Sequence, residues 1–534
     1  MKIMRYRFSA FASVFLVVAL TDIAEAQLTD VTQTTPNVPR GAIGKSLEQQ
    51  IGTGQGDVNT PGSSSYIIRR DPARAIRRGR QLFQRKFTSE QGVGPRVTAN
   101  SSGNIHDSPA FGAGLADSCA ACHGRPRGSA GFGGDVATRP DSRDAPHLFG
   151  LGLQEMLGDE ITRHLRAIRA NAVQQAAKTS TPVTLPLASK GIRYGFIKAL
   201  PNGTVDTSLV DGVDPDLRVR PFFAHGGEYS IRAFAVGAFK DEMGLEASDP
   251  ILCSATDPVQ PVRTTSPAGM VFDPSLDKIK RPPLCTVNQD GDGDGAVNEI
   301  HPAVLDYMEF YLLNYFKPAI GEMTHRAKDG PRLMEETGCT GCHVQNLPIR
   351  TDRRVADVET EFNPEQGIFN RLFAMLTTLF RVVSDGQPFP QLVPKEDSFL
   401  VKNIFTDFKR HDLGPAFHER QYDGTLIREF VTEPLWGVGS TAPYGHDGRS
   451  INLKEVILRH GGEAEESADR FADLSDEHQQ SILEFLSALI IFPPDDTASN
   501  LSPGHPGTNN PQDPAEHGGI SLGVLFQIPW EGPE

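Results

Sequence analysis

The sequence predicts a mainly α-helical protein with long irregular loops, in which two domains pack around an interdomain interface. Three observations support this fold class. Apolar residues recur at helical spacing near both ends of the central region. Glycine and proline are frequent, at 52 and 40 of 534 residues, above the roughly 12% that this pair contributes to an average protein. A short motif of cysteine and histidine occurs twice, which indicates two related units.

Two helices can be placed from their start signals and apolar spacing. Asp71 can cap a helix that has Pro72 at its first position, and Ser475 can cap another that ends before Pro493. Their apolar faces consist of Ala75, Ile76, Gly79, Leu82 and Phe83 in the first helix and Ile482, Phe485, Leu486, Leu489 and Ile490 in the second. We expect both faces to belong to the core.

Two of the three cysteine pairs run directly into a histidine, and each reads C-x-x-C-H, the spacing of c-type haem attachment. Thiols three residues apart can each add to one vinyl group of a porphyrin, and the adjacent imidazole then ligates the iron. A redox dithiol would need a βαβ context, and a zinc site would need a second ligand pair nearby. We therefore predict two covalently bound haem c groups, held by Cys119, Cys122, His123, Cys339, Cys342 and His343.

The first 26 residues have the pattern of a secretory signal peptide. Lys2 and Arg5 precede an apolar run from Phe8 to Leu20, and Ala24-Glu25-Ala26 fits a cleavage site. The run is too short to cross a bilayer, which needs about 20 residues, so we expect no transmembrane segment and export, most plausibly to a periplasm. The formal charge of −15 offers no basic surface to nucleic acid.

These anchors predict the domain organisation. Cys253 and Cys285 lie between the two haem motifs, have no adjacent histidine and are expected to form a disulfide in an oxidising compartment. The predicted segments are a signal peptide (1–26), a flexible leader (27–65), an N-terminal cytochrome c-like haem domain (66–250), a junction (251–301), a C-terminal cytochrome c-like haem domain (302–495) and a flexible tail (496–534).

The junction also contains a candidate calcium loop. Asp290, Asp292 and Asp294 alternate with glycines, as at the start of an EF-hand. The twelfth position holds His301 instead of the usual glutamate, so Glu299 or Asn298 would have to complete the cage. The alternative is a solvated turn.

Three segments of the C-terminal half, together with the two haem motifs, resemble the dihaem oxidoreductases, which are related to bacterial dihaem cytochrome c peroxidases. These segments are Phe405–Gly414, Pro434–Gly437 and Ala442–Arg449. The resemblance extends over roughly residues 70 to 493. It implies two haems with different roles.

By this resemblance, the C-terminal haem is a six-coordinate electron reservoir. The family's distal ligand, usually methionine, lies fourteen residues after the histidine of the H-D-G motif. Counting from His446 gives His460. The resemblance therefore implies ligation by His343 and His460, with a lower reduction potential than methionine would give.

The N-terminal haem is the reactive one by the same resemblance. The family's labile distal histidine would fall near Arg139, which suggests an open sixth position over His123 that His147 or His225 could fill. Glu242, followed by methionine, matches the family's acid-base glutamate. Phe223 stands where the family has an interhaem tryptophan.

The resemblance also places a calcium ion between the haems. Asp144 replaces the family's asparagine, and Thr441 and Pro443 would contribute backbone oxygens. His411, His446 and Arg449 are interpreted as propionate contacts.

The sequence as a whole predicts a dihaem peroxidase that reduces hydrogen peroxide or another small oxidant. A small soluble cytochrome or cupredoxin is the expected electron donor. Two alternatives stay open: a dihaem dioxygenase resembling the rubber-cleaving enzymes, and a non-catalytic electron-transfer cytochrome.

Overall fold

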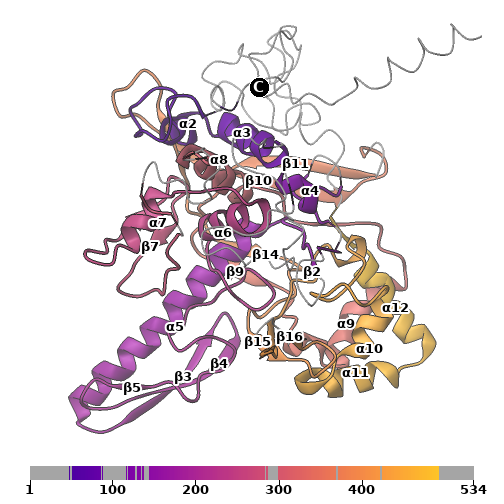
Figure 1. Ribbon diagram of the computed structural model, residues 1–534. Coiled ribbons are helices and arrows are strands. Elements are labelled where there is room, and N and C mark those ends of the chain that lie inside the picture. The colour runs from indigo at the N-terminus through magenta and orange to yellow at the C-terminus, as the bar shows by residue number, and fades with distance from the viewer. Residues whose placement is uncertain are drawn as a thin grey trace, which may run out of the picture.

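The computed structural model describes a large part of the chain (Figure 1). The described residues are Leu47 and 51–85, 87, 116, 118–126, 129–133, 135–136, 143–282, 284–286, 297, 299–367, 371–420 and 424–491. The predicted signal peptide, the predicted tail, Arg139, Asn298 and the aspartates of the candidate calcium loop (Asp290, Asp292, Asp294) lie outside these residues.

The prediction of a mainly α fold is wrong. The part of the chain that the structure describes is 35% helix and 19% strand, with several small sheets. The predicted cytochrome c-like character of the two domains is not shown. The error arises from segments such as 183–199, where exposed and buried side chains alternate along two strands, the pattern of a half-buried hairpin. Lys190 and Gly191 both have positive φ, which suits the tight turn between these strands.

The helices are distributed along the whole described chain. The α-helices are α2 (Ser64–Arg70), α3 (Pro72–Gln84), α4 (Cys119–His123), α5 (Leu151–Thr179), α6 (Ile231–Met243), α7 (Pro250–Ala255), α8 (Pro302–Leu313), α9 (Gly330–Glu336), α10 (Leu453–Arg459), α11 (Glu465–Ala472) and α12 (Asp476–Ser487). The 3-10 helices are η1 (Ala327–Asp329), η2 (Cys339–Gly341), η3 (Val438–Ser440) and η4 (Gly462–Ala464). None of the helices in these described ranges is both long and apolar enough to span a membrane.

The strands pair mostly into hairpins and short sheets. One sheet has the order β11-β10-β8-β19 and another the order β3-β4-β5. The strands are β1 (Asp135–Val136), β2 (Arg143–Asp144), β3 (Val183–Ser189), β4 (Ile192–Ala199), β5 (Val205–Asp206), β6 (Thr264–Thr265), β7 (Val271–Phe272), β8 (Ala319–Ile320), β9 (Leu347–Ile349), β10 (Ala356–Phe362), β11 (Leu372–Thr378), β12 (Phe380–Val383), β13 (Gln391–Pro394), β14 (Phe399–Val401), β15 (Arg410–Asp412), β16 (Glu419–Arg420), β17 (Leu426–Ile427), β18 (Glu429–Val431) and β19 (Leu489–Ile490).

The largest apolar core joins α2, α3, α6 and α8 (Figure 1). The predicted start of α3 is confirmed, since the Asp71 side chain accepts from the backbone N–H of Arg74 with Pro72 in the first turn. Gly79 lets α3 approach α8 closely, because a Cβ there would lie 2.2 Å from the carbonyl oxygen of Tyr307. The end of the predicted leader joins this core: the amide of Gln55 donates to Asp306 of α8 over 3.1 Å.

A buried ionic cluster fixes the same core. Arg232 of α6 is 0% exposed and donates to both carboxylate oxygens of Asp249 over 2.7 Å. It also donates to Asp306 at 2.8 Å and Glu309 at 3.0 Å on α8. Losing either side of such a cluster leaves an unpaired buried charge, which typically destabilises a protein by about 3–5 kcal/mol.

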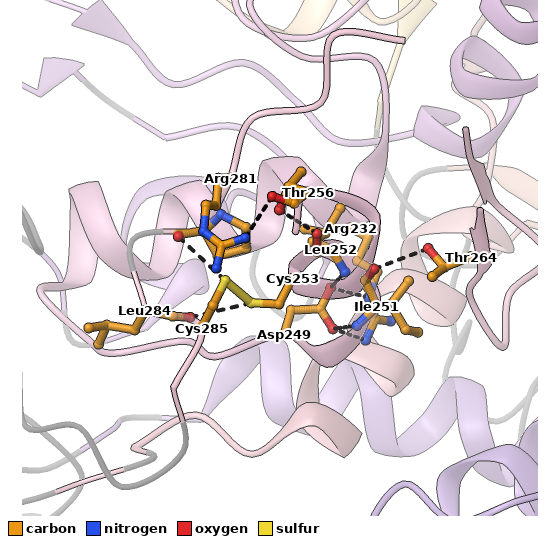
Figure 2. Close-up of a disulfide and its surroundings, with 11 residues drawn as sticks. Arg232, Asp249, Ile251, Leu252, Cys253, Thr256, Thr264, Arg281, Leu284 and Cys285 are labelled. Carbon is orange, nitrogen blue, oxygen red and sulfur yellow. Dashed lines mark hydrogen bonds and ion pairs between the residues drawn. A yellow bond between two sulfur atoms is a disulfide. The ribbon is translucent and has the colours of Figure 1, made fainter. Parts of the chain in front are cut away.

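The predicted disulfide between Cys253 and Cys285 is present, with an S–S distance of 2.08 Å. Figure 2 shows it beside Asp249, whose carboxylate caps α7 and pairs with Arg232. Arg281 donates to the carbonyl oxygen of Thr256 over 2.6 Å, which holds the two ends of this loop together. The disulfide therefore attaches residues 253–285 to the core around α6.

The other two cores surround the C-terminal motif. The long helix α5 packs on the β3-β4 hairpin and contributes to a core that reaches β9, β14 and Trp436. The second consists of α9, α10, α11 and α12 (Figure 1). Ser475 caps α12 as predicted, but the helix ends at Ser487. Leu489 and Ile490 form β19 instead, because they pair with Ala319–Ile320 in β8.

Candidate functional site

The first C-x-x-C-H motif forms the short helix α4 (Cys119–His123). Burial raises the pKa of the Cys119 thiol to about 12. The Nδ1 atom of His123 lies 2.8 Å from the carbonyl oxygen of Pro146. Since a carbonyl only accepts, Nδ1 carries the proton and Nε2 keeps its lone pair for a metal.

The second motif repeats this arrangement on a different backbone. Cys339 begins the 3-10 helix η2, and His343 places its Nδ1 atom 3.0 Å from the carbonyl oxygen of Phe405. The imidazole again keeps Nε2 for a metal. A carbonyl partner of this kind fixes both the tautomer and the ring orientation of a metal-binding histidine.

His460 lies near His343. Its Nδ1 atom donates to the carbonyl oxygen of Val456 over 2.7 Å, so its Nε2 atom is also left unprotonated. Burial, with a smaller contribution from the nearby His460, lowers the pKa of His343 to about 4. Phe417 contacts the His460 ring edge to face, with centroids 5.3 Å apart. The structure thus brings together the two histidines that the resemblance pairs.

These residues fit two haem groups. Each motif offers two thiols and one imidazole whose Nδ1 proton is already bound by a carbonyl, and the C-terminal motif has a second imidazole of the same tautomer beside it. Neutral imidazole nitrogens and cysteine sulfurs are the protein groups that c-type haem requires.

An acidic and basic cluster lies against the C-terminal motif. His411 bonds Asp407 through Nε2 at 3.0 Å and Glu463 through Nδ1 at 2.7 Å. Although burial opposes the charge, the hydrogen bond to Asp407 and the other acceptors raise the pKa of His411 to about 11. Both ring nitrogens are therefore engaged by carboxylates, which does not fit the predicted propionate contact for His411.

The same cluster contains a possible alternative site. Cys342, Asp407 and His411 offer ligand atoms within 4.8 Å of one another, as a small metal centre would. A thioether at Cys342 would remove its thiolate from such a set, so the haem and metal interpretations exclude each other at this cysteine.

The other two predicted propionate contacts lie in the loop before α10. His446 stacks on Phe430 with centroids 4.0 Å apart, and its Nε2 atom is 3.8 Å from a carboxylate oxygen of Glu419. Arg449 is half exposed and lies 3.7 Å from Asp447. Each of the two side chains thus has a carboxylate of the protein nearby.

Glu242 occupies the last turn of α6. Its carbonyl oxygen accepts from the backbone N–H of Ala116 over 3.0 Å, which brings the end of α6 to the segment that enters the first motif. Phe223 has a φ of 60°, is 40% exposed and contacts Phe234 of α6 with the rings tilted and their centroids 5.2 Å apart. Both residues therefore lie on the α6 side of the molecule.

Asp144 is brought to the loop that contains Thr441 and Pro443. Its backbone N–H donates to the carbonyl oxygen of His446 over 3.2 Å. The three residues that the resemblance assigns to calcium thus belong to neighbouring segments.

Glu299, one of the two predicted closing ligands of the other calcium loop, is buried in the structure. It is 6% exposed, and one carboxylate oxygen accepts from the backbone N–H of Glu246 over 2.5 Å. His301 caps α8 through Nδ1. These contacts direct both residues to the core.

His147 and His225, the candidate sixth ligands of the first haem, have different surroundings. His225 stacks on Phe223 with centroids 6.2 Å apart. His147 follows Pro146, whose carbonyl binds the Nδ1 side of His123, and its own Nε2 donates to the carbonyl oxygen of Trp436 over 3.0 Å. His147 therefore lies behind His123, on the side away from the nitrogen that would bind iron.

Sequence reasoning missed the cluster of Asp407 and Glu463 around His411 and the contact of His147 with Trp436. The carboxylates are separated from His411 by 4 and 52 residues. A spacing of four can be anticipated in a helix, but here His411 lies in the strand β15 and Asp407 in the irregular segment before it. The His147 contact spans 289 residues and ends on a backbone carbonyl, so no residue type signals it.

The geometry fits the class of proteins that hold two haem groups, and the comparisons with known proteins agree. Residues 398–489 match the family model described as "Di-haem oxidoreductase, putative peroxidase", which confirms the resemblance drawn from the sequence. The matched segment includes His411, His446 and His460 but neither C-x-x-C-H motif. The description of that family names haem and an oxidoreductase.

Other comparisons are weak. No curated protein matches the chain. Among solved structures, a similar chain is that of Kuenenia stuttgartiensis hydrazine synthase pressurised with 20 bar xenon, with 16% identity and a TM-score of 0.22. The match covers 37% of this chain and 59% of that chain, so this protein spans less than two thirds of its length.

Proposed function

We propose that the protein is an exported, periplasmic dihaem c-type oxidoreductase that reduces hydrogen peroxide. The observation that carries the proposal is the pair of C-x-x-C-H histidines. Each donates its Nδ1 hydrogen to a backbone carbonyl, and within the described residues His343 has His460 near it, a histidine whose Nε2 atom keeps its lone pair.

The chain's own residues would have the following roles. Cys119 and Cys122 would hold one haem through thioethers with His123 as its ligand, and Cys339 and Cys342 would hold the other with His343 and His460. When bound, the haems supply the redox chemistry, one as the site where peroxide is reduced and one as an electron store.

Proton delivery would fall to Glu242. Cleaving hydrogen peroxide into two waters consumes two protons and two electrons, and a carboxyl group can move a proton from one peroxide oxygen to the other. The hydrogen bond from Ala116 to the Glu242 carbonyl supports this role, because it brings the end of α6 to the entrance of the first haem motif. A small soluble cytochrome or cupredoxin would supply the electrons.

The position of His147 supports an enzyme over an electron carrier. A carrier needs both irons saturated by protein ligands, and His147 lies behind His123 with its Nε2 hydrogen bound to Trp436. Calcium, by the same resemblance, would bind at Asp144, Thr441 and Pro443, which the hydrogen bond from Asp144 to His446 brings to neighbouring segments.

A steady-state peroxide assay with reduced cytochrome as donor tests the proposal. We expect turnover by the holoprotein and a loss of about 10²- to 10⁴-fold in kcat for Glu242→Gln. Asp241→Asn, one residue earlier in the same helix, is the matched control and should keep wild-type turnover.

Three outcomes of this assay would change the assignment. Unchanged turnover in Glu242→Gln removes this residue from the mechanism. Dioxygen binding without peroxide turnover favours the dioxygenase alternative, in which an apolar substrate is cleaved. If the protein shows neither peroxide turnover nor dioxygen binding, the electron-transfer cytochrome is the alternative that remains.

A further inference from the structure

The two proximal histidines are joined by a chain of short contacts that begins behind His123. His123 donates through Nδ1 to the carbonyl oxygen of Pro146 at 2.8 Å. His147 is the next residue along the backbone, and its Nε2 atom lies 3.0 Å from the carbonyl oxygen of Trp436. The first half of the path therefore crosses from the segment before α5 to the segment before η3.

The tautomer of His147 follows from this contact. A carbonyl oxygen only accepts, so Nε2 carries the hydrogen and Nδ1 carries a lone pair. That Nδ1 atom is buried and has no hydrogen-bond partner among the described residues. The ring is thus held in one orientation by a single directed bond, to Trp436.

The second half of the path leads from Trp436 to His343. The backbone N–H of Leu435, adjacent to Trp436, donates to the carbonyl oxygen of Ile404 over 3.1 Å. Phe405 follows Ile404, and its carbonyl oxygen accepts from Nδ1 of His343 over 3.0 Å. Four hydrogen bonds and the covalent backbone between them connect the two imidazoles.

The residues along this path are firmly packed. Trp436 is 3% exposed and Phe405 is 1% exposed. Gly150 makes room for the indole, because a Cβ at that position would lie 2.6 Å from the Trp436 ring. Leu435 packs in the same apolar cluster as Phe405. A contiguous network of packed side chains and hydrogen bonds can carry energetic coupling between two sites.

We propose that His147 is a positioning residue that links the two proximal histidines into one hydrogen-bonded bridge and that this bridge couples the two haem centres. The inference rests on the proposed binding of two haems. One electron crossing between the centres oxidises one iron from ferrous to ferric and reduces the other from ferric to ferrous. No bond is broken and no proton is needed. His147 is assigned this bridging role instead of the role of a sixth ligand.

The rate of interhaem electron transfer tests the bridge without peroxide. A light flash generates a reductant that delivers one electron to each two-haem protein. Transfer of this electron between the two haems is then followed by absorbance. We expect His147→Phe to slow this step roughly tenfold, the lower end of the losses found for changes around a metal ligand, because phenylalanine cannot donate to the Trp436 carbonyl. We expect His147→Gln to recover most of the rate, because its amide nitrogen can occupy the place of Nε2.

Two further variants keep the test decisive. His147→Asn is polar and small, and its amide reaches only the Nδ1 position, so it should slow transfer even if His147→Phe does not accumulate. His164 is the matched control, since it is another partly buried histidine, bonded through Nδ1 to Ser189 at 2.8 Å, and lies off the path. His164→Phe should transfer electrons at the wild-type rate.

The failure of the bridge and of the proposed function can be told apart. Covalent haem is first counted as the pyridine haemochrome, and fewer than two haems per chain contradicts the proposed function. Two haems with equal transfer rates in wild type, His147→Phe and His147→Asn overturn the bridge alone. A loss confined to Trp436→Phe also overturns it, because the bridge uses the Trp436 carbonyl and not the indole.

Discussion

His123 and His343 are held in the same way but differ in what lies around them. Both donate Nδ1 to a backbone carbonyl, of Pro146 and Phe405 respectively. His343 has His460 nearby and an acidic cluster at Cys342, whereas His123 is backed by His147 and approached by the end of α6. The comparison teaches that one attachment motif can serve two roles, because the role depends on residues supplied by other segments.

The largest expected effect comes from removing one attachment motif at a time, because the haem that remains should then show the properties of one region alone. Cys119→Ser with Cys122→Ser should leave one covalent haem with a low-spin spectrum, and Cys339→Ser with Cys342→Ser should leave one that binds cyanide, because only the C-terminal motif has His460 beside it. The pyridine haemochrome and absorption spectra measure both. A low-spin, cyanide-insensitive haem in each variant would make the two regions equivalent.

Removing the disulfide should destabilise the region around α6 and leave the region of α9 to α12 as stable as before. Cys253→Ser with Cys285→Ser opens a loop with a sequence separation of 32, which should lower the free energy of unfolding by about 3–4 kcal/mol. The loss should appear in the core around α6 and leave α9 to α12 unchanged. Hydrogen exchange resolved by segment measures this, with Cys253→Ala and Cys285→Ala together as a second pair; equal loss in both regions would contradict it.

His460→Met should sharpen the difference at the C-terminal centre. Methionine is a better ligand for ferrous than for ferric haem, so the potential of this haem should rise by on the order of 100 mV, and the other haem should keep its potential. Redox titration followed by absorbance measures both centres. His478, an exposed histidine on α12, provides the control variant His478→Met. A potential that does not move would mean that His460 is no ligand.

The smallest expected effect is a pH dependence that only the C-terminal region has. The folded-state pKa of His411, about 11, lies above its ordinary value near 6.5. Its charge therefore stabilises the fold fully below about pH 6.5, and this stabilisation is lost as pH rises toward 11. The stability difference between wild type and His411→Gln should shrink from pH 6 to pH 10 in urea titrations. A constant difference would show that the two carboxylates do not hold a charged histidine.

Local signals in the sequence predicted several parts of the molecule correctly. Asp71 and Ser475 cap the helices that their neighbours predict, because capping depends on residues within one turn. The disulfide could be predicted because Cys253 and Cys285 were the only pair without an adjacent histidine. His460, found by its distance from the H-D-G motif, lies near His343, and its role as a ligand stays a prediction.

The remaining features depend on contacts distant in sequence. The strands around 356–378 and 399–431 pair across irregular loops, and their short apolar runs carry no periodicity that distinguishes them from loops. Leu489 and Ile490 continue the apolar face of α12, yet they pair with β8. The engagement of His411 by Glu463 and of His147 by a backbone carbonyl could not be read from residue types.

The most direct test of the central claim is the EPR spectrum of the fully oxidised protein, recorded with and without cyanide. The account predicts one high-spin ferric centre that cyanide converts to low spin, beside one low-spin centre that cyanide does not change. Two low-spin signals that are both insensitive to cyanide would contradict it.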